Sequence, residues 1–452
     1  MKLKDIVKDI VVELARLQLV PVARRNDGDA FPLPRMIAAG DGGGIVVSKK
    51  IDDGIAAVAK LLLDNDPSLK TGYTQAEWRT AVRRCFGPAL ASIDLDDKPQ
   101  DNAKLVLKSV REALSKDQSR QISREHAFGC TLFSDANIEA FAIGPVRFET
   151  RTNWLARQVQ AGYVTNVTAK RIRNAWQGRK LRKRKVSNES LTEDAILDAI
   201  DTCPFVCSVT TTGFAGEAAK EKSLTAARLA LAAIALLWQT PSKALNGFNL
   251  LFDRSVRRIK TLTFVPTKHV LSGSSLSHMP HGPWLKSGAW EDLLRDWKDH
   301  FAIFGEVLDF ILSPTGQVAR PKLMNTFAQA VMWFHEGCRE TVSLMAIVKF
   351  TATMDALAGG HGEPAICRVI TARLGLKPQD PIRRNGPTLS EVIKKIYGDG
   401  RSRTVHGTND KFGWDWSDTE GQAEQFAKLC LLSCMDWASQ NTAVDDPALL
   451  QK

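Results

Sequence analysis

Two residues able to do phosphate chemistry, Arg401 and His406, lie five positions apart in IYGDGRSRTVHG, residues 396–407. An imidazole titrates close to physiological pH, so His406 can take or give a proton during a reaction. A guanidinium is permanently charged, so Arg401 can hold two phosphate oxygens with its planar fork. The alternative is a structural role for both residues. His406 would then cap a helix or form a hydrogen bond within a helical bundle. Arg401 would then pair with Asp399 or Asp410.

A second feature is the basic run KRIRNAWQGRKLRKRK, residues 170–185. It contains nine basic residues and no acid, namely Lys170, Arg171, Arg173, Arg179, Lys180, Arg182, Lys183, Arg184 and Lys185. Such a density repels itself unless counterions or phosphates neutralise it, which favours contact with RNA. Trp176 could stack on a base, or pack against its own domain. A solvated loop or exposed helix face explains the run equally well, because phosphate contacts carry no sequence code.

Composition limits the number of domains, the kind of partner and the location that the protein can have. The chain has 452 residues, 44% of them hydrophobic, which is enough for two to three domains with a sizeable core. Its net charge of +11 favours polyanionic partners. The longest apolar run, residues 224–238, contains Arg228 and is shorter than the roughly 20 residues that a bilayer requires. The first helical stretch alternates charged and apolar residues, unlike a signal peptide, so we expect no membrane span and a cytoplasmic location.

The sequence predicts neither a metal nor a cofactor. Its eight cysteines include no CxxC pair of the kind that zinc sites use, and we expect reduced, mostly buried thiols. His269, His278 and His281 lie in a stretch rich in Ser, Gly and Pro without clustered carboxylates, which favours an exposed loop over a metal site. GDGGG, residues 40–44, lacks the GxGxxG spacing and the Lys-Ser/Thr of phosphate-binding loops, which indicates a flexible turn.

Hydrophobic periodicity predicts a mainly α protein with a mixed α/β middle region. Residues 1–120 form a helical N-terminal region, residues 121–315 a mixed α/β regulatory or sensing region, and residues 322–440 a C-terminal helical bundle. The helices expected before the bundle are 2–18, 52–64, 74–93, 102–116, 216–238 and 290–312. The strands expected lie within 126–133, 139–149, 203–212 and 258–266.

The C-terminal region is predicted to be helical throughout. Residues 327–358 carry apolar residues every three or four positions, the pattern of a helix buried along one stripe. Further helices are expected in GGHGEPAICRVITARLGL, in TLSEVIKKIYG and in DTEGQAEQFAKLCLLSCMDWAS. The stretch with Arg401 and His406 would then be a loop between the last two helices.

This region resembles the Apea-like branch of the HEPN superfamily. The likeness rests on MDALA at one helix end, ITARLGL in the next helix, KKIY ending a third, then RSRTVHG and a long final helix. The HEPN signature is Arg, four to six residues, then His, which Arg401 and His406 match. The residue after the Arg is often Asn, Asp or His in HEPN proteins, and here it is Ser402, which the Apea-like branch accepts.

The resemblance implies a metal-independent endoribonuclease that works as a homodimer, with Arg401 and His406 of both chains at a shared cleft. In-line attack by the 2′-OH of the RNA would leave a 2′,3′-cyclic phosphate and a 5′-hydroxyl, so DNA would not be a substrate. The supporting residues expected beside the catalytic pair are Ser402, Arg403, Asp355 and Tyr397.

Family analogy further suggests antiphage defence, or a toxin that cuts tRNA or other cellular RNA, with an unknown trigger for the N-terminal region. The competing class is a non-catalytic HEPN protein that dimerises and binds RNA or nucleotides. Both classes predict RNA binding that weakens with salt, and only the first predicts cleavage.

Overall fold

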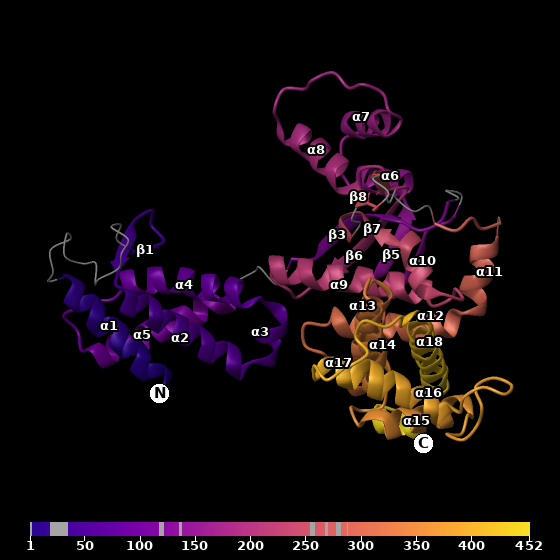
Figure 1. The fold of residues 1–452 in the computed structure, drawn as a ribbon. Helices are drawn as coiled ribbons and strands as arrows, with labels where there is room; N and C mark the ends of the chain where they lie inside the picture. The colour runs from indigo at the N-terminus through magenta and orange to yellow at the C-terminus, as the bar shows by residue number, and fades with distance from the viewer. Residues whose placement is uncertain are drawn as a thin grey trace. The chain divides into compact units, whose positions relative to one another are not determined.

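The computed structural model describes residues 2–18, 35–116, 122–134, 138–253, 258–266, 270–276, 282–286 and 288–452. In this part of the chain the protein is mainly helical with a small antiparallel sheet region, as the sequence predicts (Figure 1). The loop histidines His269, His278 and His281 lie outside the described residues.

The chain divides into two compact units, and each is described by itself. The first comprises residues 1–124 and 211–222, and the second comprises residues 125–210 and 223–452. The break expected between residues 315 and 322 lies inside the second unit. Phe304 before it and Phe327 after it are buried in the same apolar core.

The first unit is built from helices and one β-hairpin. In chain order these are α1 (Leu3–Gln18), β1 (Arg35–Ala38), β2 (Gly44–Val47), α2 (Lys49–Asn65), α3 (Pro67–Gly72), α4 (Gln75–Ala91) and α5 (Pro99–Ser115). The four helices predicted for this region are confirmed as α1, α2, α4 and α5. The antiparallel hairpin was not predicted, and the turn expected at GDGGG joins its strands, with positive φ at Gly40 and Gly42.

Local capping and one buried indole fix α4 against α2. Thr74 and Glu77 form a capping box at the start of α4, which satisfies two backbone amides that would otherwise lack partners. Trp78 is 3% exposed, and its indole nitrogen donates to the carbonyl of Ala59 in α2 at 2.8 Å. The hydrogen bond from Trp78 therefore fixes the position of α4 along α2.

The second unit contains a five-stranded sheet of order β4-β5-β6-β3-β7. Its strands are β3 (Arg124–Thr131), β4 (Phe141–Ile143), β5 (Val146–Thr150), β6 (Phe205–Thr211) and β7 (Asn249–Leu250). Between β5 and β6 the chain forms α6 (Arg151–Gln160), α7 (Asn166–Trp176) and α8 (Asn188–Ile200). Figure 1 shows α7 and α8 beyond the sheet, joined by a long loop that contains most of the basic run.

Helices and a second hairpin follow the sheet. They are α9 (Gly216–Ala235), which begins in the first unit, α10 (Pro241–Gly247), the short η3 (Leu251–Asp253), β8 (Arg258–Phe264), β9 (Val270–Leu276), α11 (Ala289–Asp296) and α12 (Lys298–Ile311). The strand predicted over 258–266 is confirmed as β8. The helix predicted over 290–312 is interrupted at Trp297, where α11 gives way to α12.

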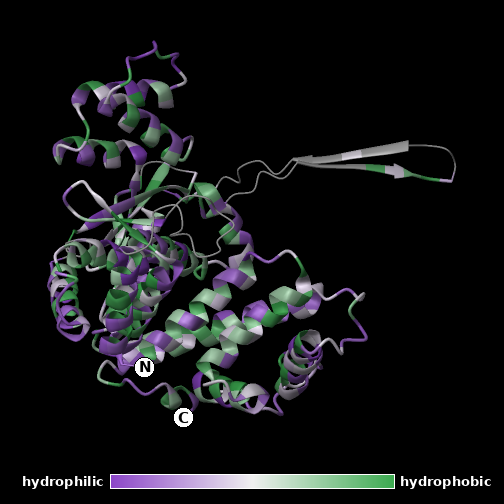
Figure 2. Ribbon diagram, turned by 90° about the vertical axis from the view of Figure 1, so that its left-hand side faces the viewer, coloured by the Kyte–Doolittle hydropathy of each residue, from purple (hydrophilic) through white to green (hydrophobic). Residues whose placement is uncertain are grey.

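The C-terminal part is helical. Its elements are α13 (Pro321–Cys338), α14 (Ser343–Leu357), α15 (Gly362–Leu374), α16 (Leu389–Lys394), the π-helical η4 (Lys395–Ser402), α17 (Arg403–Val405), α18 (Ser417–Gln440) and η5 (Pro447–Gln451). Figure 2 shows hydrophobic and hydrophilic residues alternating along the helices, as expected for helices that bury one stripe.

The prediction of one continuous helix over 327–358 is wrong, because the chain breaks between α13 and α14. Glu340 accepts hydrogen bonds from the backbone amides of Thr341 and Val342, at 2.8 and 3.2 Å, and so satisfies amides just before α14. Arg339, the C-cap residue of α13, donates to the side-chain oxygen of Asn249 at 2.5 Å. The apolar spacing continues across the break, and for this reason the pattern alone did not reveal it.

Candidate functional site

Arg401 and His406 lie on a helical turn rather than in a loop. The helix that was expected to end at Gly398 continues from α16 through η4 and α17, and the amide of His406 donates to the carbonyl of Ser402 at 3.0 Å. Gly400 permits this path, since a Cβ there would stand 2.6 Å from Cγ2 of Ile347 in α14. The prediction of a loop is therefore wrong. Single π-helical turns of this kind are frequent at functional sites.

The guanidinium of Arg401 has no carboxylate partner among the described residues. It lies 5.2 Å from the centroid of the Tyr397 ring, and its side chain is half-buried. The carboxylates that were the alternative partners bind Arg403 instead, with Asp399 at 3.5 Å and Asp410 at 3.3 Å. The charge of Arg401 is thus left available to an anion, whereas Arg403 is tied into the turn.

His406 is exposed at the end of α17. In the part of the chain that the structure describes, its ring makes no hydrogen bond, while its backbone forms the C-cap of α17. The structural role is therefore met by the backbone, and the ring stays available. The chain passes from the π-helical η4 into α17 between the two residues, so neither helix type alone sets their relative directions. Spacing along the helix therefore does not by itself bring Arg401 and His406 of one chain onto one face.

Asp355 and Tyr397 connect to Arg401 through Gly362. The Asp355 carboxylate accepts from the amide of Gly362 at 3.0 Å, at the start of α15. A Cβ at Gly362 would stand 3.1 Å from the hydroxyl oxygen of Tyr397, so the tyrosine ring is packed closely there. Asp355 thus stabilises the start of α15, which packs against Tyr397, and the Tyr397 ring in turn contacts the Arg401 guanidinium. The half-buried Ser402 contributes its backbone carbonyl.

The segment after His406 folds back on the turn. The amide of Thr408 donates to the carbonyl of Arg403 at 2.8 Å, and the side-chain amide of Asn409 donates to the Thr404 hydroxyl at 2.9 Å. These bonds hold the loop before α18 against the residues that carry the candidate chemistry.

Two aromatic residues in this loop were not singled out from the sequence. Phe412 is 67% exposed and Trp414 is 66% exposed. The Lys411 ammonium lies 5.2 Å from the centroid of the Trp414 ring, and the indole of Trp416 donates to the Lys411 carbonyl at 3.0 Å. The signal that could have revealed them is KFGWDW directly after the Arg-His motif, because exposed aromatic rings beside cations are a means of binding unpaired bases.

The basic run divides into structural and exposed residues. Arg171 and Arg184 both bind the buried carboxylate of Glu193 in α8, at 2.7 and 3.2 Å, and Arg184 also binds Glu189. The hydrogen bond from Arg171, with that from Arg184, lowers the pKa of Glu193 although burial opposes the shift. These two arginines therefore join α8 to α7 and to the loop that follows α7.

The other seven basic residues of the run are exposed, namely Lys170, Arg173, Arg179, Lys180, Arg182, Lys183 and Lys185. Trp176 is half-buried, and the Arg151 guanidinium lies 4.9 Å from the centroid of its ring. The ring thus packs against its own domain, the second of the two roles considered for it.

Among the described residues no group of three or more His, Cys, Asp or Glu side chains is placed to hold a metal ion. The helices were also searched for membrane spans, and none within the described ranges is long and apolar enough to cross a bilayer. No protein-family model matches the chain, and neither a curated protein nor a solved structure matches it.

Proposed function

We propose that this protein is a cytoplasmic, metal-independent endoribonuclease of the HEPN type, in which Arg401 and His406 act on the scissile phosphate. One observation carries the proposal. On a single well-bonded turn, Arg401 has no carboxylate partner in the described part of the chain and the His406 ring is exposed, while the neighbouring Arg403 is ion-paired. Because Asp399 and Asp410 pair with Arg403, the charge of Arg401 is left to bind an anion beside an exposed imidazole.

The chemistry follows from these side chains. His406 removes the proton from the 2′-OH, whose oxygen attacks the adjacent phosphorus, or it protonates the leaving 5′-oxygen. Arg401 stabilises the negative charge that develops on the phosphorane oxygens. The P–O5′ bond breaks, which leaves a 2′,3′-cyclic phosphate and a 5′-hydroxyl. DNA lacks the attacking hydroxyl and is not cleaved.

The proposal includes a homodimer formed through the C-terminal helices. A two-fold axis places equivalent residues of two chains opposite each other, so two copies of the turn would form a basic cleft that one copy lacks. A shared cleft could also bring Arg401 and His406 of different chains to one phosphate, which the spacing within one chain does not ensure. The activity would serve antiphage defence, or a toxin directed at tRNA or other cellular RNA.

The first experiment is incubation of the pure protein with total RNA in EDTA, followed by sequencing of the new ends. We expect discrete cuts with 2′,3′-cyclic phosphate and 5′-hydroxyl ends. Cuts that require a divalent metal, or that leave 5′-phosphates, would contradict the proposed chemistry.

A mixing experiment tests the shared cleft. Chains carrying Arg401→Ala and chains carrying His406→Ala are inactive alone under the proposal. If the phosphate lies between Arg401 of one chain and His406 of its partner, a mixture of the two variants regains activity. If each chain supplies its own Arg and His together, the mixture of the two variants stays inactive. In that case an excess of either variant, added to wild-type protein, lowers the activity more than dilution alone does. Full activity of wild-type chain under conditions that keep it monomeric would contradict both arrangements.

A second candidate function is RNA binding without cleavage. The seven exposed cations of the basic run favour it, because phosphate contacts supply affinity whether or not a bond is cut. Salt-dependent RNA binding with no cleavage of total RNA by wild-type protein would select this candidate.

A further inference from the structure

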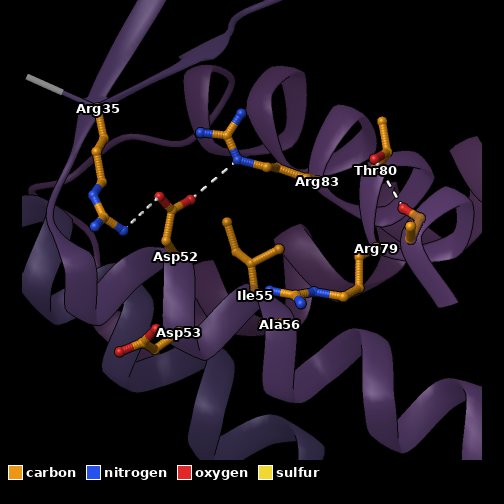
Figure 3. Close-up of a pocket in the computed structure, with 9 residues that line it drawn as sticks. Arg35, Asp52, Asp53, Ile55, Ala56, Arg79, Thr80 and Arg83 are labelled. Atoms are coloured by element: carbon orange, nitrogen blue, oxygen red, sulfur yellow. Dashed lines mark hydrogen bonds and ion pairs between the residues drawn. The ribbon is translucent and has the colours of Figure 1, made fainter. Parts of the chain in front are cut away.

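The first unit contains a pocket of about 390 Å³ between β1, α2 and α4 (Figure 3). This volume lies within the range of small-molecule sites, roughly 300 to 1,000 Å³. Three arginines line it, with Arg35 from β1 and Arg79 and Arg83 from α4. Two carboxylates of α2, Asp52 and Asp53, line the same pocket.

Two of the arginines are held in place by Asp52. Its carboxylate lies 3.1 Å from Nε of Arg83 and 3.5 Å from Nη1 of Arg35, and its side chain is only 19% exposed. Arg83 also donates from Nη2 to the carbonyl of Met36 at 2.8 Å. Figure 3 shows the guanidinium groups of Arg35 and Arg83 on either side of Asp52. A guanidinium oriented in this way loses little freedom when it binds an anion.

The third arginine carries a charge that no carboxylate contacts in the described part of the chain. Arg79 lies one helical turn before Arg83, so both side chains leave α4 on the same side and repel each other. In Figure 3 its guanidinium extends beside Ile55 and Ala56 of α2. Against the two carboxylates, the three arginines leave an excess of one positive charge in the pocket.

An adjoining pocket of about 460 Å³ shares Ala56 and Arg79 with the first and continues along α2 and α4. The largely buried Leu63 and Trp78 lie at its base, and Lys60 and Asp64 contribute one charge of each sign. A ligand can therefore extend from the arginine-lined end past Arg79 along α2 and α4.

We propose that this groove binds a nucleoside triphosphate or diphosphate. Guanidinium forks match phosphate oxygens, so Arg35, Arg79 and Arg83 would hold the phosphate groups. The base would lie against Ala56 and Leu63 in the adjoining pocket. The inference does not depend on RNA cleavage, because it concerns another unit and its readout is binding. It would give the N-terminal region a small-molecule signal to sense.

The test is isothermal titration calorimetry of the full chain at low salt with ATP, GTP, CTP and UTP, each used separately. We expect saturable binding of at least one of them, with pyrophosphate as a weaker competitor. Arg79→Gln, which removes no ion pair seen among the described residues, should weaken the binding about tenfold or more. Asp53→Asn, which removes an exposed carboxylate from the pocket, should strengthen it. Arg111→Gln on α5 changes the net charge equally outside the pocket and should leave the affinity unchanged.

Three results would overturn the inference. The first is no binding of any of the four nucleotides at millimolar concentration. The second is an equal loss of affinity in Arg79→Gln and Arg111→Gln, which would indicate general charge attraction. The third is loss of single-stranded RNA binding, but not of nucleotide binding, in Arg79→Gln, which would make the groove part of an RNA surface.

Discussion

The guanidinium of Arg401 lies over the ring of Tyr397, 5.2 Å from its centroid, one helical turn away along the π-helical segment η4. A cation on an aromatic face gains about 0.5 to 1 kcal/mol at an exposed site and more when it is desolvated. The contact therefore holds Arg401 in one direction without neutralising its charge, as a salt bridge would.

Replacing this ring should loosen Arg401 and slow cleavage. We expect Tyr397→Ala to lower the cleavage rate by roughly two- to fivefold, corresponding to the loss of one cation–π contact. Tyr397→Phe keeps the ring and should retain most of the rate. Initial rates in EDTA, measured at equal concentrations of folded protein, compare the three proteins. Equal rates for Tyr397→Ala and wild type would show that the ring does not position Arg401.

The exposed part of the basic run should bind RNA through its phosphates. Changing Lys180, Arg182, Lys183 and Lys185 to Gln should weaken unrelated single-stranded RNAs alike and reduce the salt slope by up to about three units. Arg171 and Arg184 are left in place because they bind Glu193. Fluorescence anisotropy at several salt concentrations measures both quantities. An unchanged salt slope would show that the basic run is a solvated surface that does not contact RNA.

Removal of Glu193 should destabilise the α6–α8 region in a pH-dependent way. The hydrogen bond from Arg171 lowers the pKa of Glu193 in the folded protein. The ionised carboxylate therefore stabilises the fold at every pH above the ordinary pKa of 4.5. That contribution is lost as the pH falls through the depressed folded-state pKa. Glu193→Gln should therefore lower the Tm at pH 7, and the difference from wild type should shrink towards pH 3.

Asp198→Asn, at an exposed position of the same helix, is the matched control and should change the Tm little at either pH. A Glu193→Gln protein as stable as wild type at pH 7 would show that the ion pairs contribute nothing there.

The aromatic loop should contribute to RNA affinity. Stacking of a base on an aromatic ring is worth about 1 to 3 kcal/mol, so Trp414→Ala should weaken a single-stranded RNA roughly fivefold or more. Phe412→Ala should act in the same direction. Both side chains are two-thirds exposed, so the Tm should hardly change. Analytical ultracentrifugation of the same variants is the control, since dissociation of a dimer with unchanged RNA affinity would assign the rings to a protein interface instead.

Local patterns predicted much of the fold. Helical periodicity located α1, α2, α4 and α5, and a short apolar run with β-branched residues located β6. The pattern failed between α13 and α14, where the apolar stripe continues although Glu340 bonds the amides of Thr341 and Val342 just before a new helix. The sequence pattern also failed at Gly398 and Gly400. Glycines are typical of a helix end, but here the helix continues through η4. Gly400 is instead buried against Ile347, a contact distant in sequence.

The sequence proposes the residues of the candidate site but does not specify their contacts. Residue type made Arg401 a possible phosphate ligand and His406 a possible acid or base, and the HEPN resemblance favoured these roles over structural ones. Arg403, and not Arg401, pairs with Asp399 and Asp410. This choice depends on the direction in which each side chain leaves the turn, which the sequence spacing does not specify. The exposure of Phe412 and Trp414 likewise depends on how the loop folds back.

The most direct measurement of the central claim is the cleavage rate of one mapped RNA by His406→Ala in EDTA. The matched control is Thr408→Ala, two residues away and also exposed, whose change leaves its backbone bond to Arg403 intact. Loss of a general acid or base typically costs 10² to 10⁴ in rate. We predict a fall of at least about a hundredfold for His406→Ala, with an unchanged Tm and an unchanged oligomeric state, and a near wild-type rate for Thr408→Ala. A His406→Ala protein that cuts the same RNA at the wild-type rate would contradict the account.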